Sequence, residues 1–269
     1  MANPDHVEIA KRGREAIEQW NRGHDSLWPA GDFERLDLNF ADLSGTDLSG
    51  ANLSGADISI ADLSDANLAG ANLGVARLTG AKLAGAKLAN ADLSGTDMTE
   101  SNLSDADFSD ARLNHADLSG THLVHTNFTR ADLSVAFLTK AEATGAIFVE
   151  AKLNSASMTD ANFSKADFSN ADMSEAVLSG SNLTEANFSE ANLYGADLSD
   201  SFLPGANLAG ANLSGADLSG TDMRGADLSN TNLIGAYLQD ADLSNANLSG
   251  ADLSSARLSN ARLPDGWAK

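Results

Sequence analysis

Apolar and polar residues alternate with a period of five along almost the whole chain. A large apolar residue occupies the central position of every repeat but one, from Leu38 to Leu263, without an insertion or deletion. Two residues before each centre the chain places a small residue, usually Ala, and the other three positions are mostly Asp or Asn, then Ser, then often Gly. This period fits neither an α-helix of 3.6 residues per turn nor the two-residue alternation of a simple strand.

The five-residue period instead predicts a chain that turns a corner once per repeat and winds into a stacked solenoid. The central and the small side chains point inward, and the other three positions face water. Asp, Asn, Ser and Gly are typical of turns, because the polar side chains bond the local backbone and Gly accepts a positive φ. By this pattern 46 repeats follow one another in unbroken phase over residues 36–265.

The segment ANLSGADLSGTDM, residues 211–223, resembles the pentapeptide-repeat family with its signature A(D/N)LXX. The resemblance covers the entire repeat region. It implies an all-β solenoid, a right-handed quadrilateral β-helix with four repeats per coil. Under that geometry the repeats form about eleven and a half coils and a rod of about 55 Å, at a strand spacing of about 4.8 Å.

The sequence divides into three parts: a capping helix and linker at 1–35, the β-helix at 36–265, and a tail at 266–269. We expect one helix over residues 3–22, begun by Asn3 and Pro4 and stopped by Gly23. Its apolar face is predicted to cover the first coil together with part of the linker; the covering residues include Val7, Ala10, Ile17, Trp20 and Trp28. The far end has only LPDGWAK, so the last coil is a candidate surface for a homodimer.

Four repeats per coil make residues 20 apart neighbours along the rod. One inner column then contains five stacked rings: Phe108, Phe128, Phe148, Phe168 and Phe188. Ala143 is the only small centre, and we expect a neighbouring ring to fill its volume. On the outside, Asn192, Asn212 and Asn232 are predicted to form a hydrogen-bonded ladder.

The formal net charge is −21, and residues from 36 onward contain 31 acidic and 12 basic side chains. This balance disfavours direct nucleic-acid binding, because the acids repel phosphate. Two explanations of the acids remain open. The turn itself requires Asp or Asn, which precede the centre in 31 of 46 repeats. Alternatively, the resemblance implies a DNA mimic that binds a type II topoisomerase such as gyrase and protects it from quinolones.

Basic residues are predicted to lie beside acids once the coils are stacked. Arg77 falls between Asp57 and Asp97, Lys82 follows Asp62, and Arg112 lies between Asp92 and Asp132. The apparent basic patch at residues 77–87 is therefore interpreted as separate ion pairs on successive faces.

No constellation of catalytic residues is recognisable. The serines have no paired base, and the paired carboxylates single out no acid or base. His115, His122 and His125 fall on different corners, so we expect neither a metal site nor a cofactor. The chain has no cysteine, no signal peptide at its start and no apolar run of membrane-spanning length, and a cytoplasmic protein without membrane contact is the expectation.

The repeat changes character on its outer faces near residues 134–152. Phe137 and Ile147 replace Asp or Asn, while Val135 and Val149 replace Gly and Ser. Val135 and Phe137 share one side with Val177, whereas Ile147 and Val149 lie on the opposite side. Drift of an unconstrained surface and a strip that docks a partner explain these residues equally well. The sequence as a whole predicts a non-catalytic acidic rod that acts as a protein-interaction or scaffold element, with DNA mimicry as the alternative.

Overall fold

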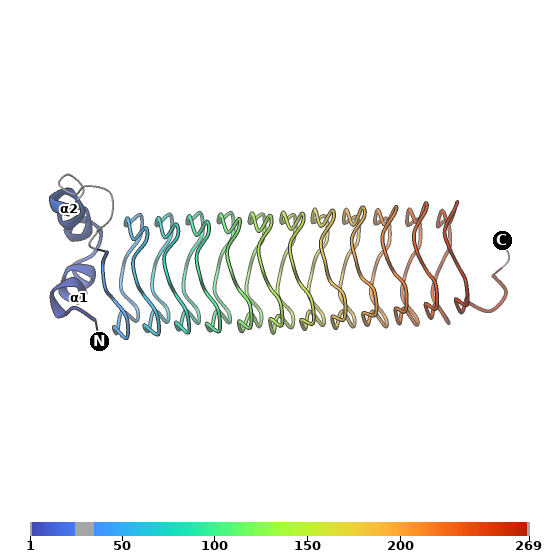
Figure 1. The fold of residues 1–269 in the computed structure, drawn as a ribbon, viewed down its shortest axis with the longest axis horizontal. Helices are drawn as coiled ribbons and strands as arrows, with labels where there is room; N and C mark the ends of the chain where they lie inside the picture. Colours follow the sequence, from blue (N-terminus) through green and yellow to red (C-terminus); the bar gives the residue numbers. More distant parts are fainter. Residues whose placement is uncertain (1, 25–34, 268–269) are drawn as a thin grey trace.

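A computed structural model describes residues 2–24 and 35–267. The chain forms two short helices followed by a long rod of stacked coils, with the helices at one end and the C-terminus at the other (Figure 1). Helix α1 comprises Pro4–Lys11 and helix α2 comprises Arg14–His24. Neither helix is long and apolar enough to cross a membrane.

The prediction of one helix over residues 3–22 is wrong, because the chain bends between α1 and α2. Gly13 lies at the bend with a φ of +79°, a conformation that glycine adopts without steric cost. Asn3 caps α1 as expected, since its side chain accepts a hydrogen bond of 3.0 Å from the Asp5 N–H. Gly23 does not end the second helix, which continues to His24.

Both helices pack against the first coil of the rod. Ala10 and Ile17 are fully buried, while Val7 and Trp20 are partly buried against the same core. His6 is also buried, a contribution that the apolar pattern did not reveal. Trp28 lies outside the described residues, so its predicted place beside the first coil stays a prediction.

The rod is built from parallel bridges between residues 20 apart, from Asp37 paired with Asp57 to Asp242 paired with Arg262. Each coil therefore has four sides of one repeat each. Two hydrogen bonds per side join successive coils at the bridge. The Leu38 N–H donates to the Asp57 carbonyl at 2.7 Å, and the Asp57 N–H donates to the Leu36 carbonyl at 2.9 Å.

Each corner is a tight turn in which the last residue of the repeat has a positive φ. From Phe40 to Asn260 these φ values lie between +52° and +75°, and the turn is closed by bonds such as Ala41 N–H to Leu38 carbonyl at 3.0 Å. The positive φ at the third turn residue is typical of a type II turn. The frequent glycine of the repeat is thereby explained.

The core of the rod is the axis itself, where central and small side chains meet. Consecutive rings of the inner phenylalanine column, from Phe108 to Phe188, lie 4.8 to 5.1 Å apart in stacked orientation. The Phe163 ring lies 6.0 Å from Phe148 and 5.5 Å from Phe168, edge to face. Phe163 thus reaches towards the coil that contains Ala143, where the core has its smallest centre.

Candidate protein-interaction surface

Val135, Phe137 and Val177 lie on one side of the rod, and we call these three residues the apolar strip. Parallel bridges join Phe137 to Ser157 and Ser157 to Val177, so the two apolar residues share one column two coils apart. Phe137 is 46% exposed and Val135 is 38% exposed, whereas Val177 is half-buried. The strip therefore combines exposed apolar area with a fixed backbone.

Ile147 and Val149 occupy a different side of the same region. Ile147 is bridged to Asn127 and Asp167 in its own column and is 38% exposed, and Val149 is half-buried. Because these residues lie ten positions, half a coil, from the column of Phe137, one flat partner surface does not reach both sets. The structure keeps the two sets apart, as the phase of the repeat predicts.

Six further large apolar side chains are exposed that the sequence interpretation did not single out: Phe40, Ile60, Val75, Tyr194, Phe202 and Ile234. The signal for them was available, since each replaces a polar residue at one of the three outward positions of its repeat. They are distributed over both halves of the rod. The stretch 134–152 is consequently one of several places where the outer surface departs from the repeat.

Where Asp precedes the central residue, its carboxylate accepts hydrogen bonds within the turn. The Asp42 carboxylate accepts hydrogen bonds from the Ser44 hydroxyl at 2.7 Å and from the Ser44 N–H at 3.2 Å. The Ser44 hydroxyl and then its N–H lower the pKa of Asp42, because both donors stabilise the ionised carboxylate. Asn does the same without charge, as in the bond from the Ser54 N–H to Asn52. The turn therefore accounts for much of the acidic composition.

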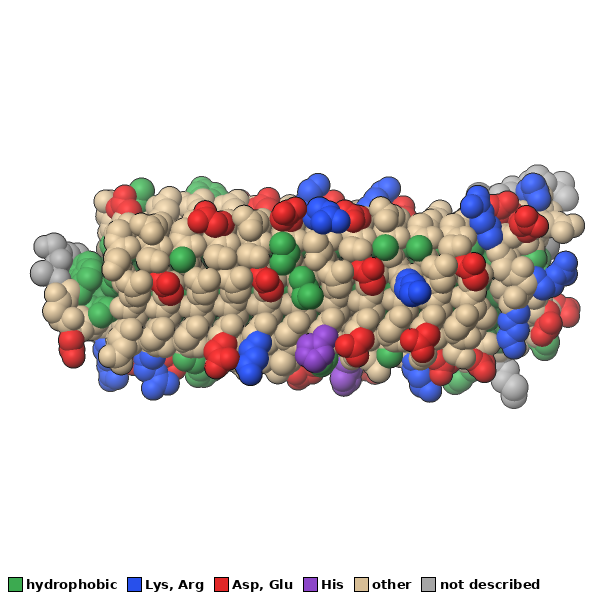
Figure 2. Space-filling view, turned by 180° about the vertical axis from the view of Figure 1, so that it is seen from behind, with side chains coloured by type: hydrophobic (Ala, Val, Ile, Leu, Met, Phe, Trp, Pro, Cys, Tyr) green, Lys and Arg blue, Asp and Glu red, His purple; other side chains and the backbone are tan. Residues whose placement is uncertain are grey.

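Basic side chains lie beside carboxylates of neighbouring coils. Lys82 is 3.6 Å from Asp62, and Arg112 is 3.5 Å from Asp92, in the columns predicted from the sequence. Arg130 makes two hydrogen bonds to Asp110, of 2.7 and 2.8 Å, and lowers the pKa of that carboxyl group. On the face shown in Figure 2, acidic and basic side chains are interspersed rather than gathered into one band.

The predicted asparagine ladder is confirmed. The Asn212 amide donates to Asn192 at 3.0 Å, and the Asn232 amide donates to Asn212 at 3.1 Å. Asn192 extends the ladder by donating to Asp172 at 2.9 Å. Such ladders fix side chains along the rod and hold neighbouring coils in register.

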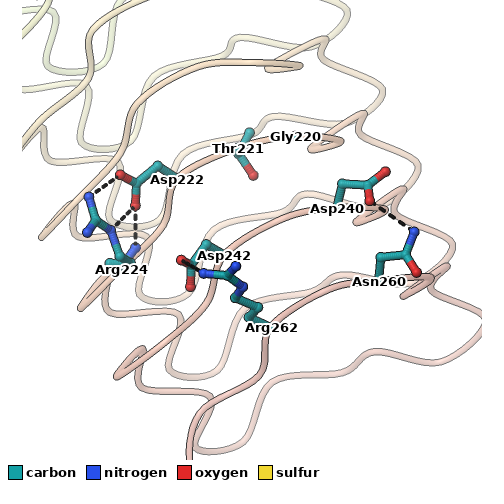
Figure 3. A pocket seen from close by; sticks show the side chains of 8 residues that line it. All are labelled: Gly220, Thr221, Asp222, Arg224, Asp240, Asp242, Asn260 and Arg262. Carbon is teal, nitrogen blue, oxygen red and sulfur yellow. Dashed lines mark hydrogen bonds and ion pairs between the residues drawn. The ribbon is translucent and has the colours of Figure 1, made fainter.

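A shallow depression of about 500 Å³ lies near the C-terminal end, lined by two arginines and three aspartates among other residues (Figure 3). Its charged groups pair with one another: Arg224 contacts Asp222 at 2.6 Å, and Arg262 contacts Asp242 at 3.6 Å. Asn260 donates to Asp240 at 3.0 Å. Both arginines of the depression are therefore paired with aspartates, and Asp240 is bonded to a neutral amide.

Over residues 2–24 and 35–267, no cluster of three or more potential metal ligands is present. His125 lies 3.6 Å from Asp105 of the preceding coil, as a pair at the surface. His115 and His122 occupy other positions of the coil, as their phases predict.

Comparison with known proteins identifies the repeat. A family model described as pentapeptide repeats matches in eight copies that together extend from residue 32 to residue 263. A search of curated protein sequences gives no significant match.

Several solved structures are similar to this chain. HetL, a pentapeptide-repeat protein involved in heterocyst differentiation regulation from the cyanobacterium Nostoc, is 32% identical over 88% of this chain and 94% of its own, with a TM-score of 0.31. A trypsin-treated variant of QnrB1, a plasmid-mediated fluoroquinolone resistance protein, is 25% identical over 69% of this chain and 90% of its own, with a TM-score of 0.46. A protein of the Arabidopsis thaliana thylakoid lumen is 34% identical over 37% of this chain and 66% of its own, with a TM-score of 0.22. The TM-scores are all below 0.5, so the assignment rests on the repeat itself.

Proposed function

Because the chain belongs to the pentapeptide-repeat family, whose solved members are right-handed quadrilateral β-helices, we propose that it is a non-catalytic rod that binds another protein on its outer faces. The observation that carries the proposal is the apolar strip. Phe137 holds an aromatic ring in solvent at a position where most repeats have Asp or Asn. Aromatic side chains of this kind are enriched among the residues that dominate binding energy at protein interfaces.

The fold itself imposes the backbone conformation at Val135, because every corner from Phe40 to Asn260 has a positive φ. Val135 has a φ of +60°, a left-handed conformation that costs a β-branched residue about 1 kcal/mol or more. Its side chain is 38% exposed, so burial within the chain offsets little of that cost. Val75 has the same conformation outside the strip, with a φ of +52°, so the backbone at Val135 does not by itself mark a binding site.

The charges beside the strip indicate the chemistry of the partner. Asp117 is bridged to Phe137 at one end of the strip, and Asp197 is bridged to Val177 at the other. Phe137 and Val177 are two coil steps apart, about 10 Å at the usual strand spacing. The strip therefore fits a short apolar groove with basic side chains at its two ends.

The proposal is tested with the double variant Phe137→Asp and Val177→Asp, compared with Phe202→Asp, which charges an exposed ring in another column. Each protein is cross-linked in native lysate and the attached proteins are identified by mass spectrometry. We expect the double variant to lose at least tenfold of one specific partner at unchanged thermal stability, because loss of a central aromatic contact costs about 2 kcal/mol. Retention of that partner by the double variant would reject the strip.

The same experiment with Ile147→Asp and Val149→Asp tests the opposite side. Loss of the partner in this variant alone moves the docking surface to that side. If both double variants retain the partner, neither apolar set is the docking surface and the proposed function is rejected.

The second candidate function is DNA mimicry towards a topoisomerase, and the net charge of −21 is the observation that favours it. Two observations weigh against it. The aspartates are hydrogen-bonded within the turns, and lysine and arginine side chains form ion pairs with carboxylates of neighbouring coils. A gyrase supercoiling assay with and without a quinolone separates the candidates. Neither inhibition nor protection at micromolar protein would end the second candidate.

We also propose the C-terminal coil as a homodimer surface. Leu253, Leu258 and Leu263 are only partly buried there, in contrast to the centres of the preceding coils. Light scattering across a hundredfold range of concentration tests this surface. A mass of one chain throughout that range would reject the homodimer.

A further inference from the structure

The two ends of the rod carry complementary backbone groups. Along the rod, each central N–H donates to a carbonyl of the next coil 19 residues on, as Leu233 does to Asp252 at 2.8 Å. In the last coil, the N–H groups of four centres have no such acceptor among residues 2–24 and 35–267; they belong to Leu248, Leu253, Leu258 and Leu263. Apart from the short tail, whose Trp267 is partly buried against the core, this end is an open β edge, which is a template for pairing with another chain.

The first coil carries the matching acceptors, and the N-terminal region bonds two of the four, the carbonyls of Asp37 and Asn52. The Asp37 carbonyl accepts from the Asn3 N–H at 3.3 Å, and the Asp37 N–H donates to Nδ1 of His6 at 3.0 Å. The Asn52 carbonyl accepts from the side-chain amide of Asn21 at 3.0 Å. This region thus supplies two of the hydrogen bonds that a preceding coil would supply.

The bend between the helices also lies directly on the first coil. A Cβ atom at Gly13 would be 3.2 Å from the Asp47 carbonyl oxygen, so the backbone of α1 and α2 closes over that acceptor. Ala10 and Ile17 are buried beneath the helices and cover the apolar axis. The edge at this end is therefore blocked both to hydrogen bonding and to apolar stacking.

We propose that α1 and α2 form a lid that prevents head-to-tail assembly, and that the open C-terminal coil fits the first coil of a second copy of this chain. The repeat count sets the geometry. The 46 repeats make eleven and a half coils, so the rod ends half a coil out of phase with its start. A second copy rotated by half a turn about the rod axis therefore continues the helix, with its Leu38 as the next centre after Leu263 of the first copy. The tail, with Trp267, moves aside for residues 36–37 of the second copy. The N–H of Leu248 then faces the carbonyl of the second copy's Asp37, and the N–H of Leu258 faces that of its Asp47.

This arrangement is heterologous, because the C-terminal end of one copy contacts the N-terminal end of the next. It therefore grows into an open filament. The homodimer proposed above closes at two chains instead. The lid thus decides between a closed assembly and an open one. Displacement of the lid exposes the acceptors and the apolar axis of the first coil together.

The test uses the full chain with Ala10→Asp and Ile17→Asp, which place two carboxylates beneath the lid. Faster tryptic cleavage after Arg14 or Arg22 reports lid displacement. We expect the mass from light scattering to rise with concentration beyond two chains, and electron microscopy to show filaments one rod wide. Addition of Leu258→Asp at the far end, which charges the surface used both by the filament and by the proposed homodimer, is expected to lower the mass to that of one chain, whereas Lys140→Asp, in a middle coil, leaves assembly intact.

Four outcomes overturn the proposal. A displaced lid with an unchanged mass shows that the two ends do not pair. A mass that stops at two chains shows a closed dimer, and aggregation that Leu258→Asp does not suppress shows non-specific apolar contact. Unchanged resistance to trypsin in the double variant contradicts the role assigned to Ala10 and Ile17 in holding the lid.

Discussion

The middle of the rod and its last coil have the same five-residue repeat, yet their side chains are packed differently. In the middle, Phe148 is fully buried and its ring contacts the rings of Phe128 and Phe168 in the coils on either side. In the last coil, Leu258 has a neighbouring coil on one side only and is half-buried. The comparison shows that the contribution of a central side chain to the free energy of unfolding depends on whether coils lie on both sides of it. The position in the repeat alone does not determine that contribution.

The largest expected difference between the two regions follows removal of a central side chain. Phe148→Ala deletes a ring packed between two others and should cost about 3–5 kcal/mol of unfolding free energy. Leu258→Ala should cost less than about 1 kcal/mol, because solvent already reaches that position. Urea denaturation followed by circular dichroism measures both. Equal losses for the two variants would contradict the comparison.

A smaller difference is expected when a side chain is added. Ala146 is fully buried at the narrow axis, and Ala146→Leu should destabilise by about 1–3 kcal/mol through overpacking. Ala256 occupies the equivalent place in the last coil and is half-buried, so Ala256→Leu should be nearly neutral. The same denaturation experiment applies. Tolerance of Leu at 146 would show that the axis has unfilled space.

The smallest effect concerns pH. The hydroxyl and N–H of Ser64 lower the folded-state pKa of Asp62, and those of Ser254 do so for Asp252. A lowered folded-state pKa stabilises the protein above the unfolded value of 3.8 and loses that contribution as the pH falls through the folded value. We expect a constant melting temperature above about pH 5 and a fall below pH 3.8, with a shallower fall for Asp62→Asn.

A thermal melt at a series of pH values measures this dependence. A rise in stability on acidification would instead show that repulsion between stacked carboxylates, such as that between Asp42 and Asp62, outweighs the corner hydrogen bonds. Asp252→Asn in the last coil provides the matched variant at the open end.

The coil was predictable because the same five-residue pattern recurs along the chain without an insertion or deletion. One small and one large apolar residue per five, with turn formers between them, leaves no other way to bury the apolar side chains. The phenylalanine column from Phe108 to Phe188 and the asparagine ladder followed once the resemblance to the pentapeptide-repeat family supplied four repeats per coil. The break between α1 and α2 did not, because Gly13 lies within a helical pattern whose apolar spacing continues past it.

The surface was less predictable than the core. Exposed residues such as Val75 and Tyr194 have no periodic signal, since only a departure from the repeat marks them. The role of His6 depends on the Asp37 N–H that lies 31 residues further along the chain. Such contacts follow from the way the helices lie on the first coil, which the repeat does not encode.

The central claim is that side chains 20 positions apart are neighbours, and paired cysteines test it most directly because the chain has none of its own. The pair Asn192→Cys and Asn212→Cys replaces two bridged residues whose amides are hydrogen-bonded. The control pair Asn192→Cys and Asp217→Cys is offset by one further repeat, onto the next side of the coil. We predict that mild oxidation cross-links the first pair rapidly in the folded protein and leaves the control pair reduced, because a disulfide requires Cα atoms within about 7 Å. Equal cross-linking of the two pairs, or cross-linking of the control pair alone, would contradict the stacked register.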